Sequence, residues 1–154
     1  MSGSRPLPKP TPETQHFWDG TQEGELRLQR CRDCTASYFP PRPFCPHCSS
    51  QNIEVFVASG RARLYSYVIS HRPSPGFEAP YAIAVVELEE GPRMMTNLVD
   101  TPQTPEALVL DMRLEVVFEG VGEGISLPLF RPAPAVDPGE SGESRESGES
   151  GVSR

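Results

Sequence analysis

The sequence lacks the features of a membrane protein or a helical bundle. Its longest uninterrupted apolar run is Tyr81 to Val86, whereas a membrane span needs roughly 20 apolar residues. The 154 residues include 18 prolines and 13 glycines, and both residue types interrupt helices. The first ten residues contain no apolar core of the kind that a secretory signal requires. We therefore expect a cytoplasmic protein without a membrane segment, and we exclude a coiled coil.

Lysine is also nearly absent, and the charge is unevenly distributed. Lys9 is the single lysine in a chain of net charge −7. Residues 26–72 carry a net charge of +5, residues 73–136 carry −7, and residues 137–154 carry −3. Because guanidinium groups bind phosphates and carboxylates alike, the basic segment suits a phosphate-bearing ligand or an acidic partner surface. The acidic second half opposes binding along nucleic-acid phosphates.

Both ends of the chain lack the apolar residues that a core needs. Residues 137–154 repeat Gly-Glu-Ser, and residues 1–10 contain three prolines. Such segments bury too little surface to offset the entropy lost on ordering. We expect disorder in residues 1–10 and 136–154, and one domain or two small ones in residues 11–135.

A short helix is predicted from Pro12 to about Glu23. Thr11 supplies a capping hydroxyl immediately before a proline at the first helical position. Phe17 and Trp18 are consecutive, so they do not lie on one helical stripe. Either one of them contacts something outside the core, or both cover the core of a small domain.

The remainder of the folded region is predicted to be mostly β. The predicted strands are residues 25–30, 53–57, 62–70, 81–88, 93–99, 113–118 and 125–130. They are short, are separated by links that contain glycine or proline, and lack helices long enough for parallel crossovers. Residues 104–110 are predicted to form one helical turn. The last five strands with this turn fit an OB-fold barrel, and a five-stranded sandwich fits the same pattern.

The four cysteines have the spacing of a structural zinc site, Cys31-x2-Cys34-x10-Cys45-x2-Cys48. Each pair can place two sulfur atoms on one ion, and the loop between the pairs lets them meet tetrahedrally. In a cytoplasmic protein, metal ligands are a better explanation for these cysteines than disulfides. Four sulfur ligands leave no open position for water or substrate, so we predict one structural zinc ion per chain.

Two alternatives to structural zinc fit parts of the same cysteine pattern. Four thiolates also bind iron, because softness and geometry do not separate the two metals. Cys45-Pro-His47-Cys48 also matches a thiol-oxidant motif, but no periodic helix follows it to lower the pKa of its first cysteine. The histidines are scattered, and no nucleophile with a neighbouring base is recognisable. The chain is therefore expected to be inactive alone.

Several segments together resemble the DUF35 family. They are Phe17-Trp18-Asp-Gly, Gly24-Glu-Leu-Arg-Leu-Gln-Arg-Cys31, Phe39-Pro-Pro-Arg42, Pro80-Tyr81, Val86-Glu-Leu and Leu127-Pro-Leu-Phe130. The resemblance implies an N-terminal helix in residues 11–25, a rubredoxin-like zinc ribbon in residues 26–58 and an OB-fold barrel in residues 59–135. Thr35 and Asp111 stand where the family usually has glycine.

The resemblance also implies a non-catalytic accessory subunit. Proteins of this family associate with thiolase-like enzymes, aldolases or hotdog hydratases, and bridge subunits or hold the CoA portion of an acyl-CoA. The candidate ligand or partner contacts are Phe17, Trp18, Arg42, His71, Arg72, Phe77 and Tyr81.

Other functions remain open from the residues alone. The loop His71 to Pro80 fits a nucleotide-like ligand, a contact at the rim of a partner, or a solvated turn. Zinc ribbons and OB-folds also bind nucleic acid. Tyr65 and Tyr67 alternate on one face of a predicted strand, where such a pair fits base stacking but more often belongs to the core or to a partner surface. A scaffold without any ligand is the third possibility.

Overall fold

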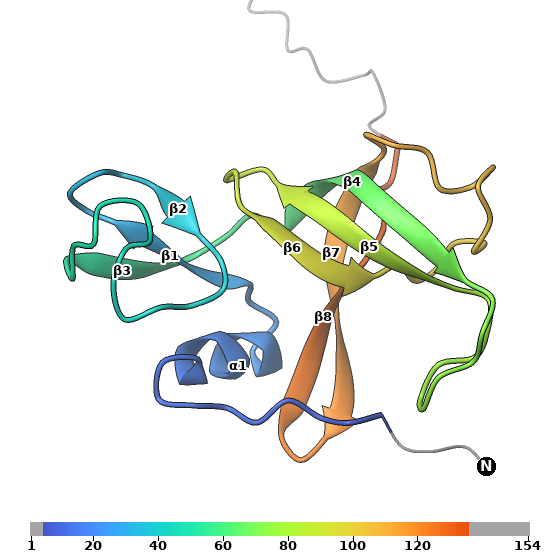
Figure 1. Cartoon of the computed structure of the whole chain (residues 1–154), viewed down its shortest axis with the longest axis horizontal. Helices are drawn as coiled ribbons and strands as arrows, with labels where there is room; N and C mark the ends of the chain where they lie inside the picture. The colour runs from blue at the N-terminus through green and yellow to red at the C-terminus, as the bar shows by residue number, and fades with distance from the viewer. Residues whose placement is uncertain (1–4, 136–154) are drawn as a thin grey trace, which may run out of the picture.

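The computed structural model describes residues 5–135, so the predicted tail of residues 136–154 and the first four residues lie outside the described part of the chain. The described part contains one helix and eight strands (Figure 1). They are α1 (Gln15–Gln22), β1 (Arg27–Cys31), β2 (Ser37–Tyr38), β3 (Ile53–Val57), β4 (Arg61–Ser70), β5 (Tyr81–Leu88), β6 (Arg93–Asn97), β7 (Arg113–Gly122) and β8 (Ile125–Pro132). Among residues 5–135, no helix is both long and apolar enough to cross a membrane.

The strands form two antiparallel sheets that lie side by side (Figure 1). The smaller sheet has the order β2-β1-β3, and we call it the ribbon. The larger has the order β6-β5-β4-β7-β8, and we call it the barrel. One parallel bridge between Leu98 and Phe130 connects the end of β6 to β8, and the Val99 N–H donates to the Phe130 carbonyl at 2.9 Å. The prediction of a mostly β fold with an OB-type sheet is confirmed, and the five strands do not divide into a sandwich.

The structure differs from the prediction at the start of the helix. Residues 12–14 form a turn, in which the Thr14 N–H donates to the Thr11 carbonyl at 3.0 Å. The Thr11 N–H in turn donates a hydrogen bond to the Thr14 hydroxyl at 2.9 Å. Thr11 and Thr14 thus bind each other within this turn, and α1 begins at Gln15. The predicted turn after β6 is present, because the Leu108 N–H donates to the Thr104 carbonyl at 3.0 Å.

One apolar core extends from the helix through the start of the ribbon into the barrel. Phe130 and Leu64 of the barrel are fully buried in the same cluster as Leu28 of β1. Phe17 is buried in this cluster, and Trp18 packs against it with the two ring centroids 5.0 Å apart. Of the two alternatives for these aromatic residues, the structure therefore shows that both cover the core.

Candidate functional site

The four cysteines lie in two turns of similar geometry at the end of the ribbon. Cys31 is the last residue of β1, and its N–H donates to the Ala36 carbonyl at 2.9 Å. The Cys45 N–H donates to the Ser50 carbonyl at 2.8 Å, which closes the second turn over the same number of residues. The residue that follows the second cysteine of each pair, Thr35 or Ser49, has a left-handed φ of 63° or 62°. Each turn therefore presents its two sulfur atoms toward the other turn.

The positions of the sulfur atoms fit a single tetrahedral metal ion. All four Sγ atoms lie within 4.8 Å of one another. The Cys31 and Cys48 Sγ atoms are 3.6 Å apart, and so are those of Cys34 and Cys45. A metal–sulfur bond of about 2.3 Å in a tetrahedron requires sulfur atoms about 3.8 Å apart. The cluster thus suits a structural metal whose coordination is completed by sulfur.

Backbone N–H groups lie near two of the four sulfur atoms, those of Cys31 and Cys45. The Cys34 N–H points to the Cys31 Sγ at 3.5 Å, and the His47 N–H points to the Cys45 Sγ at 3.4 Å. The hydrogen bond from the Cys34 backbone is the main cause that lowers the pKa of Cys31 to about 7. Burial and then the nearby sulfur charges raise the pKa of Tyr38. These N–H groups stabilise the negative charge that metal-bound sulfur carries.

A polar network connects the two cysteine turns. The Asp33 carboxylate in the first turn accepts a hydrogen bond from the Asn52 side-chain amide at 2.7 Å and another from the Ser50 hydroxyl. These hydrogen bonds lower the pKa of Asp33, and the one from Ser50 has the larger effect. The two turns are therefore held together by side chains as well as by their sulfur atoms.

Some arginines of the basic segment form ion pairs in or beside the ribbon. Arg27 forms ion pairs with Glu23 and Glu25, and Arg32 pairs with Glu54 at 3.1 Å. The net charge of +5 in residues 26–72 consequently does not form one continuous basic surface.

Arg42 lies at the junction between the ribbon and the barrel. It lines a cavity of about 350 Å³ together with Tyr38, His47 and Arg93, the last from the start of β6. The Arg42 N–H donates to the side-chain oxygen of the buried Gln29 at 2.7 Å, which holds this loop against β1. Residues of the ribbon loop and of β6 therefore line one cavity, although the Arg93 guanidinium itself binds Glu87 and lies over the Tyr65 ring.

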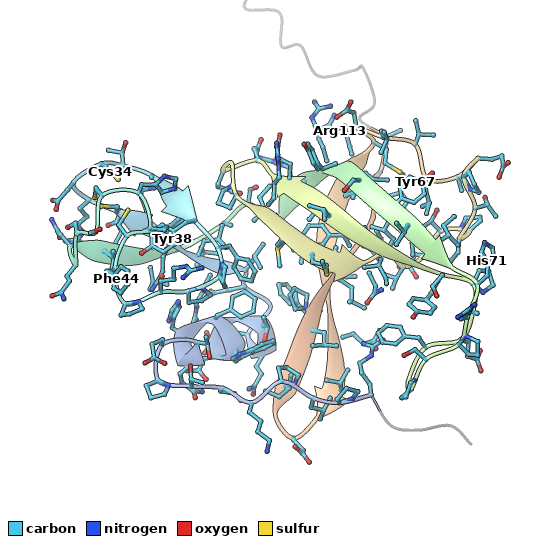
Figure 2. All side chains as sticks on the ribbon, viewed as in Figure 1. Cys34, Tyr38, Phe44, Tyr67, His71 and Arg113 are labelled. Carbon is cyan, nitrogen blue, oxygen red and sulfur yellow. The ribbon has the colours of Figure 1, made fainter. Side chains whose placement is uncertain are left out.

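The remaining predicted contacts lie elsewhere. Figure 2 shows His71 at the opposite end of the molecule from Cys34. In the same loop, Phe77 stacks on Tyr81 with centroids 4.8 Å apart, and the Arg5 guanidinium lies 4.1 Å above the Phe77 ring. The loop thus brings Phe77 and Tyr81 together, but the structure does not combine them with Arg42 or with the aromatic residues of α1 in one site.

The outer face of the barrel sheet carries an apolar patch that our sequence analysis did not identify. This outer apolar patch comprises Tyr65, Val68, Ile83, Val85 and Met95. Val68 and Met95 are 61% and 72% exposed, and the strand register places Val85 opposite Met95 and Val68 opposite Ile83. The signal in the sequence was the run Tyr81 to Val86, which is apolar at outward as well as inward positions.

A row of charged residues borders the outer apolar patch. This outer arginine row runs across four strands and consists of Arg113, Arg63, Glu87 and Arg93. Arg93 binds Glu87 at 2.8 Å, and its guanidinium lies 3.7 Å above the Tyr65 ring. The row has an excess of two positive charges, so the barrel is basic at this edge although residues 73–136 are acidic as a whole.

Comparison with known proteins matches both parts of the chain to family models. Residues 18–54 match the rubredoxin-like zinc ribbon domain of ChsH2, and residues 57–119 match the C-terminal OB-fold domain of ChsH2. A probable enoyl-CoA hydratase alpha subunit of Thermomonospora curvata is 36% identical over 84% of this chain. The chain spans only 40% of the length of that protein.

Two further relatives are matched over most of their length. A DUF35 domain-containing scaffold protein of Methanothermobacter thermautotrophicus is 35% identical, over 72% of this chain and 85% of that protein. A chain in the solved structure titled Ltp2-ChsH2(DUF35) aldolase has a TM-score of 0.73 and 35% identity, and the match covers 82% of this chain and 98% of that one. The ribbon, the OB-type barrel and these relatives together show that the chain belongs to the DUF35 family.

Proposed function

We propose that this chain is a non-catalytic accessory subunit that docks onto an enzyme subunit of acyl-CoA metabolism. The observation that carries the proposal is the outer apolar patch with its bordering outer arginine row. The names of the relatives support it, since they include a hydratase subunit, an aldolase complex and a scaffold protein. The partner is an aldolase, hydratase or thiolase-like subunit, and this chain bridges subunits or holds the CoA portion of their substrate.

The composition of the outer face suits a protein partner. Contiguous exposed apolar side chains on a sheet face mark interaction sites, and methionine, tyrosine and arginine are enriched where proteins meet. Met95 and Tyr65 supply adaptable and aromatic area, while Arg63 and Arg113 suit an acidic rim on the partner. Nucleic acid suits this face less well, because the patch is mainly aliphatic and stacking needs aromatic rings.

Contact with a CoA thioester is assigned to the cavity at the junction between ribbon and barrel. Arg42 and His47 line this cavity, and guanidinium groups bind phosphate oxygens in bidentate geometry. Calorimetric titration of the full chain with CoA tests the assignment, with Arg42→Gln as the variant and Arg72→Gln as its control. Loss of heat with Arg42→Gln alone supports it, and equal heats in both variants contradict it.

The metal is proposed to be zinc with a structural role. Four sulfur ligands complete its coordination, so the ion would stabilise the ribbon and would not activate a water molecule or substrate. Elemental analysis of the purified protein should give one zinc per chain. A red preparation that contains iron, obtained from zinc-replete cells, would contradict zinc.

The central experiment is capture of partners by the tagged full chain in its own host. We expect a stoichiometric aldolase, hydratase or thiolase-like subunit, identified by mass spectrometry and then purified for affinity measurements. Met95→Asp should weaken its binding at least about tenfold, or ~1.4 kcal/mol. Val57→Asp is the matched control, because Val57 is 56% exposed but lies on the ribbon.

Two negative results would have different meanings, one for the accessory role and one for the outer apolar patch. Recovery of RNA or DNA at physiological salt without any such enzyme would contradict the accessory role. Equal binding by the Met95 variant and the wild type would leave that role intact and would exclude the outer apolar patch as the interface.

A further inference from the structure

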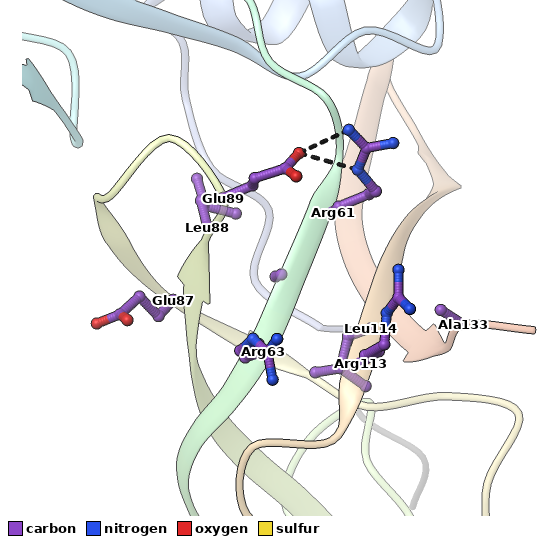
Figure 3. A pocket seen from close by; sticks show the side chains of 9 residues that line it. Arg61, Arg63, Glu87, Leu88, Glu89, Arg113, Leu114 and Ala133 are labelled. Carbon is purple, nitrogen blue, oxygen red and sulfur yellow. Dashed lines mark hydrogen bonds and ion pairs between the residues drawn. The ribbon is translucent and has the colours of Figure 1, made fainter. Parts of the chain in front are cut away.

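A cavity lined by arginines opens on the barrel where β4, β5 and β7 lie side by side (Figure 3). Its volume is about 470 Å³. Arg61 and Arg63 extend from β4, Arg113 from β7, and Glu89 from the turn after β5, while Ala133 lines the side toward the end of the described chain. We call it the arginine cavity.

The charges of one row in this region are matched within the sheet. The row consists of Arg131, Glu115, Arg61 and Glu89, in which basic and acidic residues alternate. Arg131 binds Glu115 at 2.8 Å, and Arg61 binds Glu89 at 2.8 Å. Each guanidinium in this row therefore has a carboxylate as its neighbour.

In the next row, two residues along β4 and β7, the charges of Arg63 and Arg113 are not balanced by ion pairs among the described residues. Arg63 and Arg113 are direct cross-strand partners, and like charges in this arrangement destabilise a sheet. Within residues 5–135, neither of them forms an ion pair, and the Arg63 guanidinium donates a hydrogen bond to the Asp111 carbonyl at 3.4 Å. Glu87, the cross-strand partner of Arg63 on β5, also lines the cavity, but its carboxylate binds Arg93 at 2.8 Å. The sheet thus presents two adjacent cations to the arginine cavity, and neither is ion-paired with a carboxylate of residues 5–135.

The end of the described chain, which lines this cavity, is followed in the sequence by the acidic Gly-Glu-Ser repeat of residues 137–154. The Ala133 N–H donates to the Arg113 carbonyl at 3.0 Å, so the end of the described chain runs along β7. Acidic residues then follow at nearly every third position, as Asp137, Glu140, Glu143, Glu146 and Glu149. Asp137 is four residues beyond Ala133, a span of at most about 14 Å. The first carboxylates of the tail are therefore within reach of both arginines.

We propose that the arginine cavity is a carboxylate-binding site and that its occupant is the acidic tail of the same chain. A single exposed ion pair binds only weakly, because water screens the two charges. The tail offers several equivalent carboxylates, however, and tethering gives them an effective concentration on the order of millimolar. The interaction is consequently a dynamic, salt-sensitive one in which successive Glu residues exchange at Arg63 and Arg113.

The interaction has a consequence for docking. Arg63 and Arg113 belong to the outer arginine row, so a bound tail covers the edge at which the acidic rim of a partner would lie. This consequence rests on the proposed function, whereas binding of the tail to the cavity does not require any partner.

The proposal is tested by NMR on the full chain and on a variant of the same length with a neutral tail. The variant replaces all five acids, as Asp137→Asn, Glu140→Gln, Glu143→Gln, Glu146→Gln and Glu149→Gln. Backbone amide and arginine side-chain signals of Arg63 and Arg113 should differ between the two proteins at low salt. The differences should vanish at about 0.5 M NaCl, where the Debye length is about 4 Å.

Arginine variants then identify the binding site. In the background of Arg63→Ser with Arg113→Ser, neutralising the tail should no longer shift the amides of neighbouring cavity residues such as Ala62. Arg42→Ser is the matched control, because it removes an exposed arginine of the ribbon and should preserve those shifts.

Two results would overturn the proposal. One is identical cavity spectra for the wild-type and neutral tails at low salt. The other is a shift of the cavity signals by inorganic phosphate in the neutral-tail variant together with no effect of the acidic tail, which would assign the cavity to small anions.

Discussion

The ribbon and the barrel reach their folded states by different means. The barrel shares a cluster of 15 buried apolar residues with α1 and the start of β1, whereas the distal end of the ribbon has a cluster of three, two of which are Cys31 and Cys45. Burial of apolar area supplies most of the free energy of folding in the first case. In the second, the apolar area is too small, and metal coordination has to supply the difference.

The two regions nevertheless meet in β1. Leu26, immediately before this strand, and Leu28 within it are buried in the barrel cluster, while Cys31 at the end of the strand belongs to the cluster of the distal turns. The Ala58 N–H returns to the Leu26 carbonyl at 2.8 Å, which fixes the exit of the ribbon beside its entry. A metal bound by the four cysteines would therefore position the distal turns, while the barrel core positions the base of the same sheet.

Removal of the metal should have the largest effect. Structural zinc sites contribute apparent binding free energies of about 10–16 kcal/mol at neutral pH, so chelation or Cys45→Ser should unfold residues 31–52. Hydrogen exchange is the measurement. We expect loss of amide protection in the ribbon with retained protection in β4 and β5. Simultaneous loss of protection in both regions would show that the barrel, like the ribbon, depends on the metal for its folding.

The second largest effect is expected from the barrel core. Phe130 is fully buried and its carbonyl accepts the hydrogen bond from Val99 that joins the sheet edges. Phe130→Ala should lower the free energy of unfolding by about 3–5 kcal/mol, as measured by urea denaturation of the metal-loaded chain. Val57→Ala, at a 56% exposed position, is the control and should change it by less than about 0.5 kcal/mol.

Features encoded locally were predictable from the sequence. The cysteine spacing predicted which sulfur atoms meet, because each pair lies within one turn. The alternation of residues predicted most strands, since the side-chain period of two repeats over five or more residues. β2 was missed because two residues, Ser37 and Tyr38, are too few to show a period.

Features that depend on register were not predictable. Arg63 and Arg113 are 50 residues apart in sequence, and only the pairing of β4 with β7 places them opposite each other. The outer apolar patch likewise requires the alignment of three strands. The relative positions of the candidate contacts in α1, the ribbon loop and the loop after β4 also depend on the three-dimensional arrangement, and their role in binding a ligand or a partner stays a prediction.

The two departures from the glycine pattern of the family prove to be at left-handed positions. Thr35 has φ 63° and Asp111 has φ 65°. This conformation costs a β-branched residue about 1–2 kcal/mol and costs Asp less. Thr35→Gly in the ribbon should therefore stabilise the protein by a net amount of about 0.5–1 kcal/mol, after the higher entropy of unfolded glycine is included.

Asp111→Gly in the barrel is the matched comparison, and the gain should be smaller. Thermal unfolding of the metal-loaded proteins measures both. A destabilised Thr35→Gly variant would show that the hydrogen bond from the Thr35 hydroxyl to the Cys34 carbonyl, 2.7 Å long, outweighs the backbone strain.

The smallest expected effect is a different response to salt of two carboxylate pKa values, that of Glu89 in the barrel and that of Asp33 in the ribbon. A hydrogen bond from Arg61, and then one from Ser59, lowers the pKa of Glu89 in the barrel below its ordinary value of 4.5. The hydrogen bonds from Ser50 and Asn52 lower that of Asp33 in the ribbon below 3.8. Because both folded-state pKa values are depressed, each group stabilises the protein above its unfolded-state pKa. Each group loses this contribution as the pH falls through its folded-state pKa.

Since salt screens a charged donor more than neutral ones, the pKa of Glu89 measured by NMR titration at high salt should rise toward 4.5, while that of Asp33 should stay depressed. Equal responses to salt would show that the ion pair with Arg61 does not control Glu89.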